Sequence, residues 1–164
     1  MRRGSSEVIT GDWDFKGKVT FREAAIFKKA PFGREQIYTP IFTGFGTPSS
    51  VNFHWVRLGN RIFVNGRWTC GTTTAVEARI SLPGAFMSDG ALVTAIEVCG
   101  NAVHSVNGAN YFACLIGSGL GYINIGLGNA ANNTLTPIAS TSAIFSSGQT
   151  LSVAFNFPIS GWNV

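Results

Sequence analysis

The sequence predicts an all-β protein with two parts. Residues 37–164 are expected to form an antiparallel jelly-roll sandwich, here called the head domain, and residues 1–36 a short N-terminal β stalk with an anchor. Apolar and polar residues alternate in about eight to ten short runs, and turn residues separate these runs at the spacing typical of sandwiches. No window combines a helical hydrophobic period with start and stop caps.

The stalk prediction begins with a phenylalanine repeat within residues 14–32 (DFKGKVTFREAAIFKKAPF). Phe15, Phe21 and Phe27 recur at a spacing of six, which is a multiple of the strand period, so their rings share one strand face with Val19. Lys16, Lys18, Arg22 and Lys28 fall on the other face. A lone ribbon with one aromatic face is not stable in water. Packing of three identical chains through these four residues is the simplest way to bury the aromatic face. The alternative is a single edge strand folded back on the head domain.

The first fourteen residues show no periodic apolar pattern. Arg2, Arg3 and Trp13 are the candidate anchor residues, and this segment is expected to become ordered only on a docking partner. Met1, Arg2 and Arg3 are followed by polar residues rather than by an apolar run, so no signal peptide is predicted. We therefore expect synthesis in the cytoplasm of the producing cell.

From residue 37 onward, short strands follow one another. Alternation predicts a strand at 51–55, a tight turn at Gly59 and Asn60, and a strand at 61–64. A further strand at 76–82 places its even-numbered apolar residues on one face, and Pro83 ends it. The remaining expected strands are 92–99, 102–106, 110–116, 121–127 and 151–157. The glycine-rich segment 117–121 is interpreted as a turn between two of them.

Charge is distributed very unevenly along the chain. Residues 1–37 hold eight Lys or Arg and five Asp or Glu, whereas residues 98–164 hold none of these four types. A surface of Asn, Ser, Thr and Gly either meets sugars or is buried in an oligomer. Phosphate binding requires a dense basic patch, so nucleic acid is not an expected partner. No apolar run is long enough for a membrane helix, and membrane insertion is not expected.

Three cysteines, an odd number without a C-x-x-C pair, give no disulfide framework. Cys99 and Cys114 lie in apolar, strand-like stretches, so we expect buried free thiols there. Cys70 is likewise expected to be reduced.

Residues capable of catalysis are few. His54 and His104 have no second ligand at metal spacing, and nothing in the sequence brings Asp89 and Glu97 together as an acid–base pair. We therefore predict no catalytic residues, no metal site and no cofactor, and the ligand-binding residues of the head domain are not identified.

Several stretches carry a family resemblance. They are YTPIFTGFGT (38–47), VNFHWVRLGN (51–60), GRWT (66–69), EARISLP (77–83) and the tail 147–162. Together they resemble the C-terminal head domains of tailed-bacteriophage fibre and virion-surface proteins. Such heads are similar to C1q- and tumour-necrosis-factor-like jelly rolls and form tight homotrimers. The family brings no catalytic residues.

The resemblance implies a non-enzymatic virion protein, a short homotrimeric spike or fibre. Its N-terminus would dock on other virion proteins of the capsid or the tail, and its head would face outward. Two roles stay open: attachment to host-surface glycans, and a purely structural role as a capsid decoration protein. Only about 36 residues precede the head, which favours a short spike over a long fibre.

Overall fold

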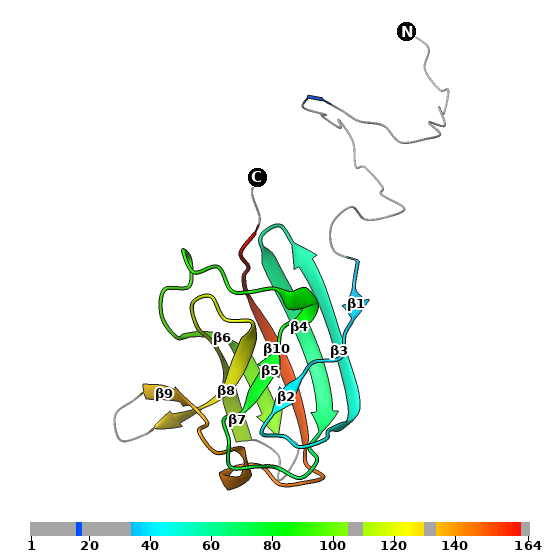
Figure 1. The fold of residues 1–164 in the computed structure, drawn as a ribbon, viewed down its shortest axis with the longest axis vertical. Helices are drawn as coiled ribbons and strands as arrows, with labels where there is room; N and C mark the ends of the chain where they lie inside the picture. Colours follow the sequence, from blue (N-terminus) through cyan, green and yellow to red (C-terminus); the bar gives the residue numbers. More distant parts are fainter. Residues whose placement is uncertain (1–15, 18–33, 105–109, 130–133, 162–164) are drawn as a thin grey trace, which may run out of the picture.

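Ten strands, all paired antiparallel, build the part of the chain that the computed structural model describes, namely residues 16–17, 34–104, 110–129 and 134–161 (Figure 1). The strands of the first half are β1 (Gln36–Ile37), β2 (Phe42–Thr43), β3 (Ser49–Leu58), β4 (Arg61–Thr69) and β5 (Arg79–Ser81). Those of the second half are β6 (Glu97–His104), β7 (Asn110–Ile116), β8 (Tyr122–Asn129), β9 (Thr134–Pro137) and β10 (Thr150–Pro158). Two 3₁₀ turns, η1 (Pro83–Ala85) and η2 (Thr141–Ala143), are the helical segments described.

The strand order places the end of the described chain in the middle of the sheet. The order is β1-β3-β4-β10-β6-β7-β8-β5-β2, with β9 attached to β8. Strand β10 therefore lies between β4 and β6, as Figure 1 shows. Because this strand pairs with both halves of the chain, neither half completes the sheet without it.

Aromatic packing brings the two ends of this sheet together. Phe42 lies on the terminal strand β2, yet its ring centroid is 5.9 Å from that of Phe53 on β3 and 5.3 Å from that of Trp68 on β4. The backbone N–H of Ser81 on β5 donates to the carbonyl of Ile41, which precedes β2. The sheet is thus curled on itself, with the architecture of a β sandwich, and the predicted all-β antiparallel class is confirmed.

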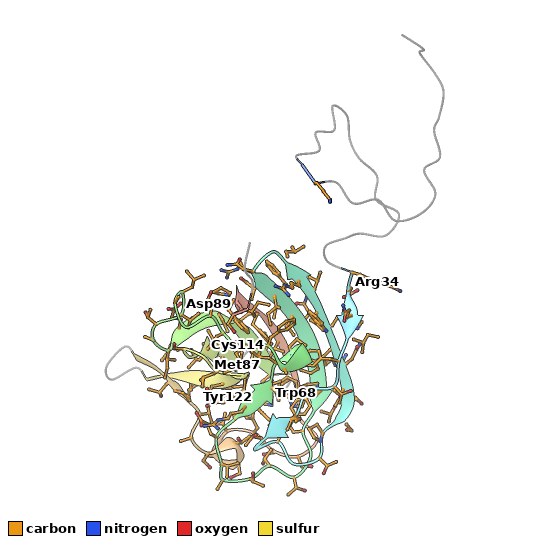
Figure 2. The ribbon with its side chains drawn as sticks, turned by 45° about the horizontal axis from the view of Figure 1, so that its top comes forward. Arg34, Trp68, Met87, Asp89, Cys114 and Tyr122 are labelled. Atoms are coloured by element: carbon orange, nitrogen blue, oxygen red, sulfur yellow. The ribbon has the colours of Figure 1, made fainter. Side chains whose placement is uncertain are left out.

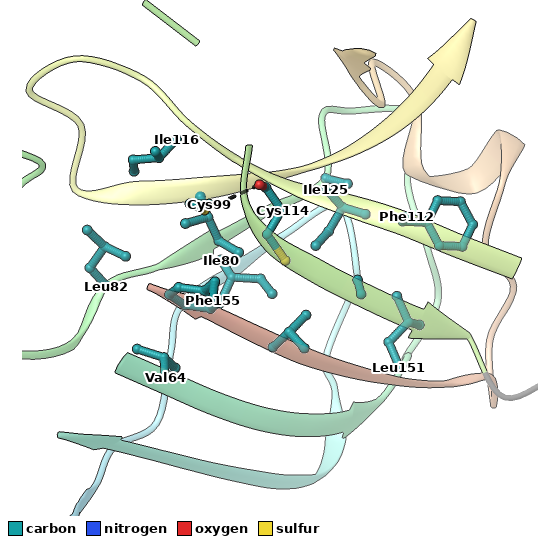
Figure 3. Packing of buried hydrophobic residues seen from close by; sticks show 14 of the residues in the cluster. Val64, Ile80, Leu82, Cys99, Phe112, Cys114, Ile116, Ile125, Leu151 and Phe155 are labelled. Atoms are coloured by element: carbon teal, nitrogen blue, oxygen red, sulfur yellow. Dashed lines mark hydrogen bonds between the residues drawn. The ribbon is translucent and has the colours of Figure 1, made fainter. Parts of the chain in front are cut away.

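Alternating side chains of the strands fill the space between the two halves of the curled sheet (Figure 3). Four apolar residues of β10 are buried, namely Leu151, Val153, Phe155 and Phe157. Ser152 and Ala154, which lie between them, are exposed. This is the alternation that the sequence predicts for 151–157, and it is confirmed. The predicted strand 110–116 coincides with β7, and the glycine-rich segment 117–121 is the turn between β7 and β8.

The prediction of two separate strands at 92–99 and 102–106 is wrong, because a single strand, β6, runs from Glu97 to His104. The apolar side chains of Leu92 and Ile96 are more than half exposed, so they had no core to enter. Gly100 continues the strand instead of ending it: a Cβ there would lie 2.1 Å from the carbonyl oxygen of Ala154. Glycine allows β6 and β10 to approach closely at this point.

The predicted strand 76–82 is shortened to β5, and β9 was not predicted. Ala78, Ile80 and Leu82 are buried on one face as expected, but Val76 is 46% exposed. The predicted stalk core (Phe15, Val19, Phe21, Phe27) and the predicted anchor (Arg2, Arg3, Trp13) lie outside the described residues. The jelly-roll topology, the stalk and the trimer stay predictions.

Candidate ligand-binding site

A cavity of about 310 Å³ opens where β6 separates from β10. The two strands pair from Leu151 and His104 to Phe155 and Gly100. Beyond that point Cys99 is an extra residue in β6, because its pairing with β7 shifts register between Val98 and Gly100. A β-bulge bends its strand. The start of β6 and the end of β10 therefore line the cavity from two sides.

Three polar side chains line this cavity from three different strands. They are Arg61 at the start of β4, Glu97 at the start of β6 and Asn156 near the end of β10. Nη2 of Arg61 donates a hydrogen bond to Oδ1 of Asn156 at 2.7 Å. Arg61 is also the cross-strand partner of Pro158, so the sheet fixes the base of its side chain. We call Arg61, Glu97 and Asn156 the polar triad.

Apolar side chains complete the lining. Leu92 and Val93 come from the segment before β6, Val98 from β6 itself, and Ile116 from the end of β7. Val93 and Ile116 are buried, whereas Leu92 and Val98 are more than half exposed. The segment 89–93 is held in place by backbone bonds, since the N–H of Asp89 donates to the carbonyl of Pro158 and the N–H of Val93 to that of Asp89. The backbone of 89–93 is thus fixed next to the end of β10, and the exposed side chains of Leu92 and Val98 form an apolar rim.

Charged groups are scarce in residues 37–164, which contain four arginines and three acidic residues. Glu77 forms an ion pair with Arg79 and accepts a hydrogen bond from Nδ2 of Asn124 at 2.6 Å. The Asp89 carboxylate accepts the N–H of Ala91 at 2.9 Å. By contrast, the Glu97 carboxylate has no hydrogen-bond or ion-pair partner among the residues that the structure describes.

A second hollow, of about 220 Å³, is apolar and lies in the uncharged half of the chain. Leu127 of β8 and Ile144 beside η2 are exposed large apolar side chains of its lining, to which Pro137, Ile138 and Ala143 also contribute. We call it the β8–β9 groove. It offers surface for packing and no charged group.

The two histidines occupy different settings. Nδ1 of His54 is 3.3 Å from a carboxylate oxygen of Glu35, and its Nε2 is 2.8 Å from Oδ1 of Asn52. The contact with Glu35 joins the segment directly before β1 to β3. His104 is buried at the end of β6, with its ring edge-on to Phe145 at 5.7 Å. Within the described ranges, no three His, Cys, Asp or Glu residues are grouped so as to hold a metal ion.

All three cysteines are buried, which confirms the predicted setting of Cys99 and Cys114. Burial raises the pKa of Cys70 to about 11 and that of Cys99 to about 12. The pKa of Cys114 lies well above its ordinary value, first because of burial and then because of neighbouring Cys99. The thiol of Cys99 donates to the carbonyl oxygen of Cys114 at 3.3 Å, the dashed line of Figure 3. These groups stay protonated at neutral pH and are poor nucleophiles.

The polar triad was not found from the sequence. Arg61 is 36 positions from Glu97 and 95 positions from Asn156 in the sequence. Only the strand order brings the three residues together. One signal was present: Glu97 is the last charged residue before the uncharged half. Figure 2 shows the described side chains around the sheet, with Asp89 among those labelled.

No family model, no curated protein and no solved structure matches this chain. Among the described residues, no helix has both the length and the apolar character needed to cross a membrane.

Proposed function

We propose that this protein is a non-enzymatic virion structural protein of a tailed bacteriophage, a short homotrimeric spike on the particle surface. Its jelly-roll head, residues 37–164, presents a surface that binds a host-surface glycan. Residues 1–36 form the β stalk and the anchor, through which the spike docks on capsid or tail proteins.

The observation that carries the proposal is the set of uncharged side chains that β10 and the part of β6 paired with it expose on the outer face of the sheet. Ser152 and Ala154 on β10 and Asn101 on β6 are exposed, and Ala154 and Asn101 are cross-strand partners. Hydroxyl and amide groups can exchange hydrogen bonds with sugar hydroxyls in both directions. The exposed arginines Arg61 and Arg67 of β4 border these positions, because they are the cross-strand partners of Pro158 and Ser152.

Trimer formation is supported by surface that a single chain leaves uncovered. The β8–β9 groove exposes Leu127 and Ile144 in a half of the chain that has no charged residue. Exposed apolar patches of this kind are typical of protein–protein contacts. In the proposed spike, neighbouring copies cover the groove, and the cavity beside β6 stays open to ligand.

The same apolar groove also favours a second candidate function, that of a capsid decoration protein. In that arrangement a neighbouring capsid subunit would cover Leu127 and Ile144, and the head would have no ligand. The two candidates differ in copy number, since a decoration protein occupies lattice points over the whole capsid.

Binding of the full chain to immobilised bacterial surface polysaccharides tests the proposal. Purified lipopolysaccharide O-chains, capsular polysaccharides and teichoic acids serve as probes, and bovine serum albumin is the control analyte. The proposal predicts saturable binding to at least one of these polymers. A chain that binds none of them, and that coats the capsid of the particle in hundreds of copies, would establish the decoration role instead.

A further inference from the structure

We infer that the cavity between β6 and β10 is a binding subsite for one neutral sugar ring, held by the polar triad of Arg61, Glu97 and Asn156. This inference rests on the proposed glycan-binding function and names the site and the ligand class. It follows from the hydrogen-bonding groups, the charge and the size of the cavity.

The triad offers both donors and acceptors. Arg61 uses Nη2 for its hydrogen bond to Asn156, and its guanidinium carries further N–H donors. Asn156 accepts that bond through Oδ1, so its amide nitrogen is oriented as a donor. Glu97 supplies carboxylate acceptors that no other described residue occupies. A ligand that matches this set must itself both donate and accept, as adjacent sugar hydroxyls do.

The charge of the triad favours a neutral ligand. One guanidinium and one carboxylate line the same cavity, so their charges offset each other. A phosphate or a uronic acid would gain from Arg61 but would be repelled by Glu97. A cationic ligand would gain from Glu97 but would be repelled by Arg61. A polyhydroxy ligand without charge uses both groups without an unpaired charge.

Size and walls agree with a single ring. Ligand pockets range from about 300 to 1,000 Å³, and this cavity, at about 310 Å³, is near the lower limit. The exposed side chains of Leu92 and Val98 form the apolar rim against which the C–H face of a pyranose can pack. Because the rim is open, the rest of a polysaccharide chain can continue into solvent.

Ligand-observed saturation-transfer NMR on the full chain tests the inference. The probes are the methyl pyranosides of glucose, galactose, mannose and N-acetylglucosamine, with methyl glucuronide and inorganic phosphate as anionic counterparts. We expect at least one neutral pyranoside to bind, and Arg61→Gln and Glu97→Gln each to weaken its binding about tenfold or more, as loss of a charged hydrogen-bonding group does. Both residues are exposed, so the variants are expected to fold.

Arg67→Gln is the matched control. Arg67 is an exposed arginine on the same strand as Arg61 and does not line the cavity. Binding that is equally reduced in Arg67→Gln would overturn the assignment to the cavity, and stronger binding of glucuronide or phosphate would overturn the neutral ligand.

The polysaccharide assay separates failure of this inference from failure of the proposed function. If polysaccharides bind and both cavity variants bind them as well as the native chain, the sugar site lies elsewhere on the head and the inference is wrong. If neither polysaccharides nor pyranosides bind, the glycan-binding function itself is wrong.

Discussion

At the scale of single residues, the fold changes the chemistry of the cysteines most clearly. Apolar neighbours predicted buried thiols at Cys99 and Cys114, and the structure shows these two and also Cys70 buried. The extent of the change depends on tertiary packing: Cys99 and Cys114 come from adjacent strands and meet at the bulge of β6. That bulge cannot be read from the local sequence pattern, because it is set by the pairing of β6 with its neighbours.

Buried thiols predict a loss of stability in alkaline solution. An exposed thiol has a pKa of about 8.5, whereas Cys70 and Cys99 have raised values of about 11 and 12 in the folded chain. Above about pH 9 the unfolded chain loses these protons and the folded chain keeps them, so the free energy of unfolding falls as pH rises. The slope is at most about 1.4 kcal/mol per pH unit for each thiol.

Urea unfolding between pH 7 and pH 11 measures this dependence. Cys99→Ala is the control, and its stability should fall less steeply because one of the titrating groups is gone. A native chain with equal stability at pH 8 and pH 10.5 would contradict the account.

Gly66→Ala is expected to destabilise the head domain through a clash in the core. Gly66 is the cross-strand partner of Phe53, and a Cβ at position 66 would lie 2.2 Å from the Phe53 ring. Phe53 is fully buried and has no room to move aside. Overpacking of this kind costs about 1–3 kcal/mol, so thermal unfolding should occur several degrees lower.

Gly128→Ala is the matched control for that substitution. It lies on β8, and its added Cβ would meet only Leu135 Cδ2, at an ordinary contact distance of 3.8 Å. An unfolding temperature equally lowered in both variants would show that the Phe53 ring is not the cause.

At the scale of secondary-structure elements, the sequence predicts strands well where alternation is regular and one face enters the core. β7 and β10 were predicted almost to the residue. Prediction failed at 92–96, where Val93 enters the core but Leu92 and Ile96 stay exposed, and at β9, whose four residues contain too little pattern. β9 pairs with β8, the strand directly before it in sequence, whereas 92–96 belongs to no strand.

The short strand β2 closes the curled sheet through one aromatic ring. Phe42 packs against Phe45, Phe53 and Trp68, with ring centroids 5.3 to 6.2 Å away. We expect Phe42→Ala to lower the free energy of unfolding by about 2–3 kcal/mol, less than the 3–5 kcal/mol of a fully buried phenylalanine, because Phe42 is half-buried.

Urea denaturation of Phe42→Ala beside Phe42→Leu measures the effect. The leucine variant keeps part of the apolar contact and should lose clearly less stability. If the alanine variant unfolds at the same urea concentration as the native chain, β2 does not hold the two ends of the sheet together.

At the scale of the whole molecule, composition predicted the class of surface better than it predicted the site. The run without charged residues, 98–164, indicated a neutral face, and the exposed positions of β10 agree. The polar triad could not be predicted, because Arg61 and Asn156 become neighbours only when β10 inserts between β4 and β6.

Trimerisation is the prediction that belongs to this scale. Burial of one phenylalanine contributes roughly 1.5–3 kcal/mol, and the predicted stalk supplies Phe15, Phe21 and Phe27 from each of three chains. Light scattering on the full chain should give three times the chain mass of 17.5 kDa at micromolar concentration. Replacing the three rings by serine should shift the mass toward that of the monomer. A monomer mass for the native chain would rule the trimer out.

The most direct test of the central claim is an image of purified phage particles, from the phage that encodes this chain, labelled with a gold-conjugated antibody against residues 37–164. We expect gold on the outer surface of the particle, and a loss of label when residues 1–14 are deleted while the truncated chain still folds. Its position also separates a tail spike from a protein on the capsid. Particles that carry no label, although infected cells contain the protein, would contradict the claim that it is a virion protein.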